Sequence, residues 1–364
     1  MSENLPRQRI PLILMGLLAL LVAMWAGLIR LGWAFPAGPA AWARYHGPLM
    51  VSGFLGTVIA LERAAAIGRR WTYLAPALSG LGGLALVLGL PHPVGPALIT
   101  AGSLGLLAVF ADILRRHQAL YLFTMAIGAV AWLMGNALWL VGWPVARVVL
   151  LWAGFLILTV LGERLELSRV LRPGRQAQAV FAGAVALFTA GIVVSIADFD
   201  LGWRLTGVGM IALVFWLARF DVARRTIRKP GLTRFIAVCL LCGYFWLAVG
   251  GLLAISDGAV IAGPRYDAFL HAVFLGFVFS MIFGHAPMIL PAVLGIPVAY
   301  WRGLYAHLIL LQVSLLMRVP ADLAGWENLR RWGGMLNVIA LLLFLLVTAI
   351  TARRGQSASA RGQG

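Results

Sequence analysis

Six histidines occur in the chain, and four of them lie in or at the edge of long apolar runs. These four are His46, His271, His285 and His307. A polar ring inside a membrane-spanning segment is energetically costly, so such residues are functional candidates by default. The other two, His92 and His117, fall in short polar connections, where a solvated ring needs no functional role.

The first candidate pair is His46 and His271. His46 opens a predicted span over residues 46–67, and His271 lies one or two turns into a predicted span over 265–290. Both spans are expected to enter the membrane from the outer face, which places the two rings at similar depth. Two neutral imidazoles from different helices commonly hold a low-spin haem in a helical bundle. We therefore predict that His46 and His271 are axial ligands of a b-type haem; alternatively, each ring bonds a backbone carbonyl or a water, or serves another metal or a proton.

A second candidate pair lies deeper in the membrane. His285 follows His271 by fourteen residues, which in an α-helix returns it to within about 40° of the same face, roughly 21 Å further along. His307 is near the middle of a predicted span over 298–318. The two rings are candidates for a copper site or a proton relay. Packing between helices is an equal alternative for each of them.

Two further groups of residues carry charge or sulfur. Arg330 and Arg331 fall in the last predicted outer loop, where guanidinium groups can bind haem propionates bidentately, or can simply be solvated. Cys239 and Cys242 are one helical turn apart in an apolar run, where small packing residues are more common than a metal site.

Two Glu-Arg pairs close apolar runs. Glu62-Arg63 and Glu163-Arg164 are candidates for proton or ion carriers, but such pairs are more often helix ends at which the arginine extends to the interface. We expect the second behaviour for both pairs.

The composition indicates the elements that position these residues. Of 364 residues, 62% are hydrophobic and only 11% are charged, and the mean hydropathy is +0.94. These values exclude an ordinary soluble domain, and the runs are too continuous for a membrane barrel. We predict an all-α membrane protein of about twelve transmembrane helices, forming a single polytopic domain over 1–354 with a disordered tail over 355–364. The predicted spans are 10–31, 46–67, 72–90, 93–113, 118–141, 143–164, 176–197, 201–220, 232–256, 265–290, 298–318 and 332–352.

The charge distribution predicts an orientation. The net charge is +17, and 21 of the 29 lysines and arginines fall on one side when the N-terminus is placed in the cytoplasm. The positive-inside rule then favours both termini in the cytoplasm and a multi-pass protein of a bacterial inner membrane. Anionic lipid contact is an additional expectation, and a nucleic-acid partner is not needed to explain the charge.

A short pattern recurs in every fourth predicted span. A Gly-Phe pair is followed, nine residues after the glycine, by a polar residue near the cytoplasmic end. The pairs are Gly53-Phe54, Gly154-Phe155 and Gly276-Phe277, and the polar residues are Glu62, Glu163 and His285. The recurrence suggests three pseudo-repeated arcs of four helices.

Two stretches resemble the NnrS family of bacterial membrane proteins. They are Tyr45-His46-Gly-Pro-Leu-Met50-Val-Ser-Gly53-Phe54 and His271-Ala-Val-Phe-Leu-Gly276, the latter continuing through Met281 and Gly284. The resemblance implies a twelve-helix protein that contains haem and copper and is associated with denitrification and nitric oxide stress. That family tends to carry a second histidine two residues after the first, where this chain has Pro48.

A weaker resemblance is to the catalytic subunit of haem-copper oxidases. That subunit has twelve helices in three arcs, a low-spin haem between helices two and ten, and an Arg-Arg pair near the propionates. The run Phe283-Gly-His285-Ala-Pro-Met-Ile-Leu-Pro is similar to its copper-ligand stretch, but it falls in span ten rather than span six. Spans six and seven have no histidine. The resemblance therefore implies one haem site and argues against an oxygen-reducing haem-copper centre.

Together these observations predict an NnrS-like haem-binding protein of the inner membrane, involved in nitric oxide response or in electron transfer linked to denitrification. Its expected partners are the lipid bilayer, nitric oxide and a membrane or periplasmic electron donor. Whether it is a haem or haem-copper oxidoreductase is left open. The alternative is a twelve-helix secondary transporter without cofactor, although the parallel orientation of the recurring spans differs from an inverted repeat. An assembly or sensing partner of a reductase is a third possibility.

Overall fold

The computed structural model describes residues 5–36, 41–171, 173–295 and 298–361, and every regular element in these ranges is a helix. The chain divides into two compact units. Unit 1 comprises Met1–Phe155 and Ile289–Gly295, and unit 2 comprises Leu156–Met288 and Ile296–Gly364. The prediction of an all-α membrane protein is confirmed, while the three arcs and the orientation stay predictions.

Unit 1 contains the first six predicted spans up to the middle of α7. Its helices are α1 (Leu5–Arg30), α2 (Ala41–Pro48), the π-helix η1 (Leu49–Gly56), α3 (Thr57–Ile67), the 3₁₀ turn η2 (Arg70–Tyr73), α4 (Leu74–Val87), α5 (Val94–Arg116), α6 (Leu120–Leu140) and the first part of α7 (Val145–Ser168). The C-terminal end of α13 also belongs here, since Arg9 donates to the Val293 carbonyl over 2.6 Å.

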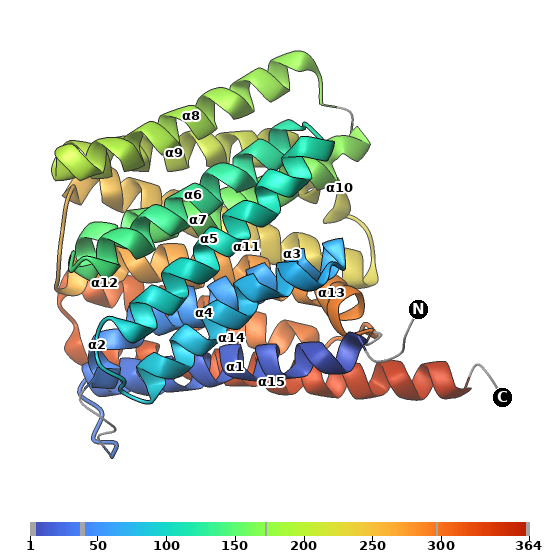
Figure 1. Cartoon of the computed structure of the whole chain (residues 1–364), viewed down its shortest axis with the longest axis horizontal. Helices are drawn as coiled ribbons and strands as arrows, with labels where there is room; N and C mark the ends of the chain where they lie inside the picture. The colour runs from blue at the N-terminus through green and yellow to red at the C-terminus, as the bar shows by residue number, and fades with distance from the viewer. Residues whose placement is uncertain (1–4, 37–40, 172, 296–297, 362–364) are drawn as a thin grey trace. The chain divides into compact units, whose positions relative to one another are not determined.

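Unit 2 contains the remaining spans. Its helices are the second part of α7, η3 (Arg169–Leu171), α8 (Arg175–Ala197), α9 (Phe199–Phe220), α10 (Ala223–Thr226), α11 (Gly231–Asp257), α12 (Pro264–Leu270), the π-helix η4 (His271–Phe279), α13 (Ser280–Leu294), α14 (Leu304–Ala324) and α15 (Glu327–Arg361). Helices α8 and α9 form a close hairpin, drawn in green in Figure 1. A Cβ on Gly202 would lie only 2.2 Å from the Ser195 Cα, so glycine is required for this approach.

All twelve predicted spans coincide with helical segments. Among the residues described, eleven helices are long and apolar enough to cross a membrane. The one remaining predicted span, 72–90, corresponds to α4, which has only 14 residues. Helix α15 continues to Arg361, so residues 355–361, predicted as a disordered tail, are helical; this stretch contains no proline to end the helix. Residues 362–364 of that tail lie outside the described ranges.

Both units hold their helices together with tryptophan-centred hydrogen bonds. In unit 1, the Trp132 indole donates to Ser52 over 3.0 Å, and the Trp152 indole donates to the Asn136 carbonyl oxygen over 3.0 Å. In unit 2, the Trp246 indole donates to Gln312 over 2.7 Å. Polar groups in an apolar bundle must be satisfied within the protein, so these bonds specify which helices pack together.

Candidate functional site

His46 is held by the first helix. It lies in the last turn of α2, directly before the π-helix η1, and its Nδ1 is 2.7 Å from the Ala23 carbonyl oxygen of α1. A Cβ on Gly27 of α1 would lie 3.0 Å from the His46 Cε1, so the ring packs against this glycine. Because a carbonyl can only accept, Nδ1 carries a proton, and in the neutral ring the lone pair is then on Nε2.

His271 has the same tautomer but a different anchor. It begins the π-helix η4, and its Nδ1 is 2.7 Å from the Asp267 carbonyl oxygen one turn earlier. Its ring is half-buried, as is that of His46. π-Helices are rare and are frequently found at functional sites, and one begins at His271 and another three residues after His46, which gives the two predicted ligands a shared local signature. His46 belongs to unit 1 and His271 to unit 2.

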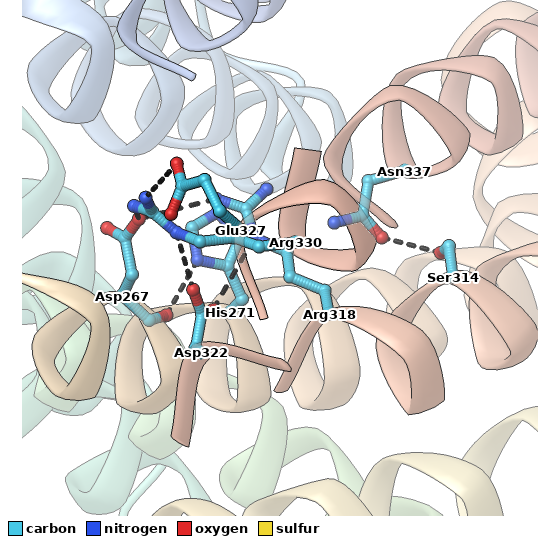
Figure 2. Close-up of polar contacts among 8 residues, drawn as sticks. All are labelled: Asp267, His271, Ser314, Arg318, Asp322, Glu327, Arg330 and Asn337. Atoms are coloured by element: carbon cyan, nitrogen blue, oxygen red, sulfur yellow. Dashed lines mark hydrogen bonds and ion pairs between the residues drawn. The ribbon is translucent and has the colours of Figure 1, made fainter. Parts of the chain in front are cut away.

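A cluster of charged residues surrounds His271 (Figure 2). Arg330 is its centre. The guanidinium donates through Nε to Asp322 over 2.7 Å and through Nη2 to Asp267 over 2.8 Å, and its Nη1 lies 3.4 Å from Glu327. The predicted propionate ligand is thus bonded to carboxylates of its own chain, while the adjacent Arg331 is half-buried.

A second arginine, Arg318, contacts two of the carboxylates that bind Arg330. Arg318 of α14 is 3.5 Å from the Asp267 carboxylate and 3.8 Å from that of Asp322. The Asp322 side chain is 0% exposed and that of Arg318 is 7% exposed, so these charges are enclosed by the bundle. Three carboxylates and two guanidinium groups therefore share one site. The charges of Arg318 and Asp322 are compensated by neighbours rather than by water, whereas Glu327 is 65% exposed.

The sequence reasoning missed Asp267, Arg318 and Asp322. Asp267 precedes His271 by one turn, and Arg318 and Asp322 are four residues apart at the end of an apolar run. Ionisable residues at such positions are candidates for the same reason that the histidines are. The signal that could have found them is a shared face of α14, on which the buried residues His307, Ser314, Arg318 and Asp322 follow at spacings of seven, four and four.

The deeper histidines differ from each other. His285 resembles the other two, with Nδ1 2.7 Å from the Met281 carbonyl oxygen one turn earlier. His307 is 1% exposed, and neither of its ring nitrogens has a hydrogen-bond partner among the described residues. The rings of Phe283, Phe344 and Phe235 surround it, with centroids 4.5, 5.3 and 6.0 Å away. Within the described ranges, no group of three or more His, Cys, Asp or Glu residues could hold a metal ion.

The predicted role of one Glu-Arg pair is wrong. Arg164 does not extend to the interface: it is 1% exposed and donates through Nε and Nη2 to both oxygens of Asp221, over 2.8 and 2.9 Å. Asp221 ends α9 and provides the buried partner that the sequence did not reveal. Arg63 pairs with the adjacent Glu62 over 2.9 Å, and the two side chains are 14% and 21% exposed. Cys239 and Cys242 are both free thiols.

The fold is similar to that of a solved membrane oxidase. A heme-copper terminal oxidase, solved as a dimer by cryo-electron microscopy, superposes with a TM-score of 0.69 at 12% sequence identity. The match covers 97% of this chain and 84% of the oxidase chain. At this identity the similarity defines the fold, which is a multi-helix membrane bundle of the oxidase type.

A family model also matches almost the whole chain. The chain belongs to the family described as "Domain of unknown function (DUF8744)", whose model matches residues 9–353. No curated protein matches the chain.

Proposed function

We propose that this protein is a membrane haem protein, with His46 and His271 as axial ligands, that transfers electrons. The resemblance to the NnrS family supports a role in the response to nitric oxide or in denitrification in a bacterial inner membrane. Its partners would be nitric oxide and a membrane or periplasmic electron donor. The oxidase-type fold supports the haem part of this proposal, and the sequence stretches around the two histidines support the nitric oxide part.

The observation that supports the proposal most is the hydrogen bond that each of the two imidazole rings forms. In each, Nδ1 donates to a backbone carbonyl over 2.7 Å, so that in the neutral ring the lone pair is on Nε2. A histidine that ligates a metal usually donates its other ring N–H to a carbonyl or carboxylate in this way, which fixes the ring orientation and raises the basicity of the ligating nitrogen. Both residues therefore fit an iron ligand.

The charge cluster would accept a haem propionate in place of one of its own carboxylates. Arg330 presents several donors in one plane, and Arg318 supplies a second positive charge behind it. A propionate would share or replace a carboxylate such as that of Glu327, whose contact with Arg330 is the longest at 3.4 Å. The cluster would hold the propionate by charge-assisted bidentate bonds.

A haem would supply one-electron chemistry through its iron, and His46 and His271 would hold it. In this arrangement the protein residues orient the group, exclude water and compensate the charge near the propionates. His285 and His307 are the candidates for a separate copper site, and the buried His307 ring without a partner in the described ranges supports this assignment.

The test is a reduced-minus-oxidised visible spectrum of the purified protein, recorded with His46→Gly and His271→Gly. We expect a b-type signal in the unaltered protein, its loss in each variant, and partial recovery when free imidazole is added to either variant. Imidazole recovery distinguishes a ligand from a residue that only maintains the fold, because added imidazole replaces a ligand and not a packing contact.

The matched control is His117→Gly, since His117 is exposed at the end of α5 and should keep the full signal. Metal analysis of the same preparations, with His307→Leu added, tests copper: the copper content should fall in His307→Leu while the haem signal stays. A colourless unaltered protein, expressed with sufficient haem, would contradict the proposal and favour the transporter alternative.

A further inference from the structure

A hollow with strongly basic walls lies in unit 2, where α9 ends and α10 begins. It has a volume of about 570 Å³. This is within the range of small-molecule pockets, roughly 300–1,000 Å³. Five of its nine lining residues are cationic: Arg219, Arg224, Arg225, Arg228 and Lys229. Asp221 is the single acidic residue among the nine.

The negative charge of Asp221 is already compensated. Arg164 holds both of its carboxylate oxygens, and the Ala223 backbone N–H donates to one of them over 2.6 Å. Both side chains of the ion pair are almost completely enclosed, at 2% and 0% exposure. The charge of the lining residue Asp221 is thus neutralised by Arg164, and Asp221 does not oppose the binding of an anion.

The five cations have no such compensation. All five are exposed. Their contacts are with uncharged groups: Arg219 lies over the Phe220 ring, and Arg224 donates to the Arg219 carbonyl. Across the part of the chain that the structure describes, none of them forms an ion pair with a carboxylate. In unit 1, by comparison, the basic residues Arg69 and Arg116 share the carboxylate of Asp112.

The orientation of the chain in the membrane does not by itself explain why unpaired basic residues surround a pocket. The positive-inside rule explains why basic residues gather in loops on one side, but it requires neither a cavity nor the absence of counter-charges. Converging unpaired guanidinium groups around a hollow are the feature that recognises phosphate, because each guanidinium can donate two parallel hydrogen bonds to phosphate oxygens.

We propose that this pocket binds a phosphate-bearing anion with more than one negative charge. Two sources share this chemistry: the headgroup of an anionic lipid at the membrane surface, and a soluble di- or polyphosphate compound. The arginines of α10 and the following turn would hold the phosphate oxygens, and the Arg164–Asp221 pair would keep the base of the pocket in place.

The test uses the full-length protein and two triple variants of equal charge. Arg224→Gln/Arg225→Gln/Arg228→Gln removes three cations of the pocket, and Arg70→Gln/Arg115→Gln/Arg302→Gln removes three exposed cations elsewhere. In one arm, pyrophosphate is titrated into detergent-solubilised protein by calorimetry. In the other, native mass spectrometry measures cardiolipin retained after extraction from nanodiscs of phosphatidylcholine and cardiolipin.

In at least one arm, the pocket variant should lose about tenfold or more in affinity or retention, the loss expected when a charge-assisted contact is removed, while the other variant should bind like the unaltered protein. Selective loss in the cardiolipin arm alone identifies the lipid, and selective loss in the pyrophosphate arm alone identifies a soluble ligand. Equal loss in both variants, or no loss in the pocket variant in either arm, would overturn the proposal. Neither triple variant touches the predicted haem ligands, so the haem spectrum checks that each variant is folded.

Discussion

At the residue scale, the enclosed charges of this protein are compensated by partners in its own chain. Arg164 is bonded to Asp221, and Arg318 lies between the carboxylates of Asp267 and Asp322. The cost of removing a charge from water is met only when the partner is in place, so one substitution leaves the other charge uncompensated. Buried pairs of this kind therefore fix which helices pack together more than they raise the overall stability.

Substitution of Asp221 by Asn should destabilise the protein strongly. Arg164 would keep its charge without a charged partner, and the expected loss is about 3–5 kcal/mol in the free energy of unfolding. Unfolding of the purified protein in mixed micelles, followed by circular dichroism, measures the loss. The double variant Arg164→Met/Asp221→Leu should be less destabilised than Asp221→Asn, because neither charge remains.

The exposed pair of Arg116 and Asp112 is the matched control for this experiment. Its N–O distance of 2.8 Å equals that of the buried pair, but Arg116 is 46% exposed. Arg116→Met should change the free energy of unfolding by no more than about 1 kcal/mol. Equal losses for the exposed and buried pairs would show that burial of Arg164 is not the cause.

At the element scale, the two π-helices distinguish spans two and ten from the other spans. η1 follows His46 and η4 begins at His271, and each continues as an ordinary α-helix, α3 and α13 respectively. The wider turn rotates every later side chain relative to a continuous α-helix, so the estimate that His285 lies within about 40° of the face of His271 does not apply across η4. Close packing accompanies the π-helix: a Cβ on Gly276 would lie 2.4 Å from the Trp246 Cβ.

Gly276→Ala should therefore destabilise the protein by about 1–3 kcal/mol, the range for overpacked sites. The control is Gly183→Ala in α8, where a Cβ would meet nothing within 4 Å. That substitution should leave the stability unchanged or raise it by up to about 1 kcal/mol, because alanine favours the helix. Thermal unfolding of the two variants gives the comparison, and a stable Gly276→Ala protein would show that η4 can shift away from Trp246.

The elements were predictable from the sequence to different degrees. Hydropathy alone located all twelve spans, because continuous apolar runs of this length have few other structures. It did not separate 265–290 into α12, η4 and α13, since a π-turn changes the geometry of the chain and not its composition. Bonding of each ring to a backbone carbonyl was the alternative to the haem pair, and the structure shows such a contact at both histidines while the haem stays a prediction. The carbonyl at His271 is one turn earlier in the chain, whereas the one at His46 belongs to α1 and depends on packing that no local pattern encodes.

The candidate site was predictable only in part for a similar reason. The four histidines and Arg330 stand out from their neighbours by residue type. The carboxylates that bind Arg330 come from residues 63 positions earlier and 8 positions earlier in the chain, and Asp221 is 57 positions from Arg164. Partners at such separations follow from tertiary packing, and a single sequence does not reveal which of several acids is chosen.

At the scale of the whole molecule, the distribution of basic residues predicts the orientation of the bundle. Both termini are expected in the cytoplasm, since 21 of the 29 lysines and arginines then lie on that side. A green fluorescent protein fused after Gly364 should fluoresce, and alkaline phosphatase fused there should be inactive. The same reporters fused after Gly258, in a predicted outer loop, should give the opposite result, and the reverse pattern would invert the assignment of inner and outer faces.

The surroundings of the two histidines are synthesised at different times. The Ala23 carbonyl that accepts from His46 lies 23 residues earlier in the chain, so this contact is complete once α1 and α2 have been synthesised. The charges around His271 include Arg330 and Glu327 of α15, the last helix. Because a chain is made from its N-terminus, the surroundings of His271 form only at the end of translation. A haem bound by both histidines would therefore enter a finished polypeptide, and ribosome-bound chains that stop before α15 would not retain it.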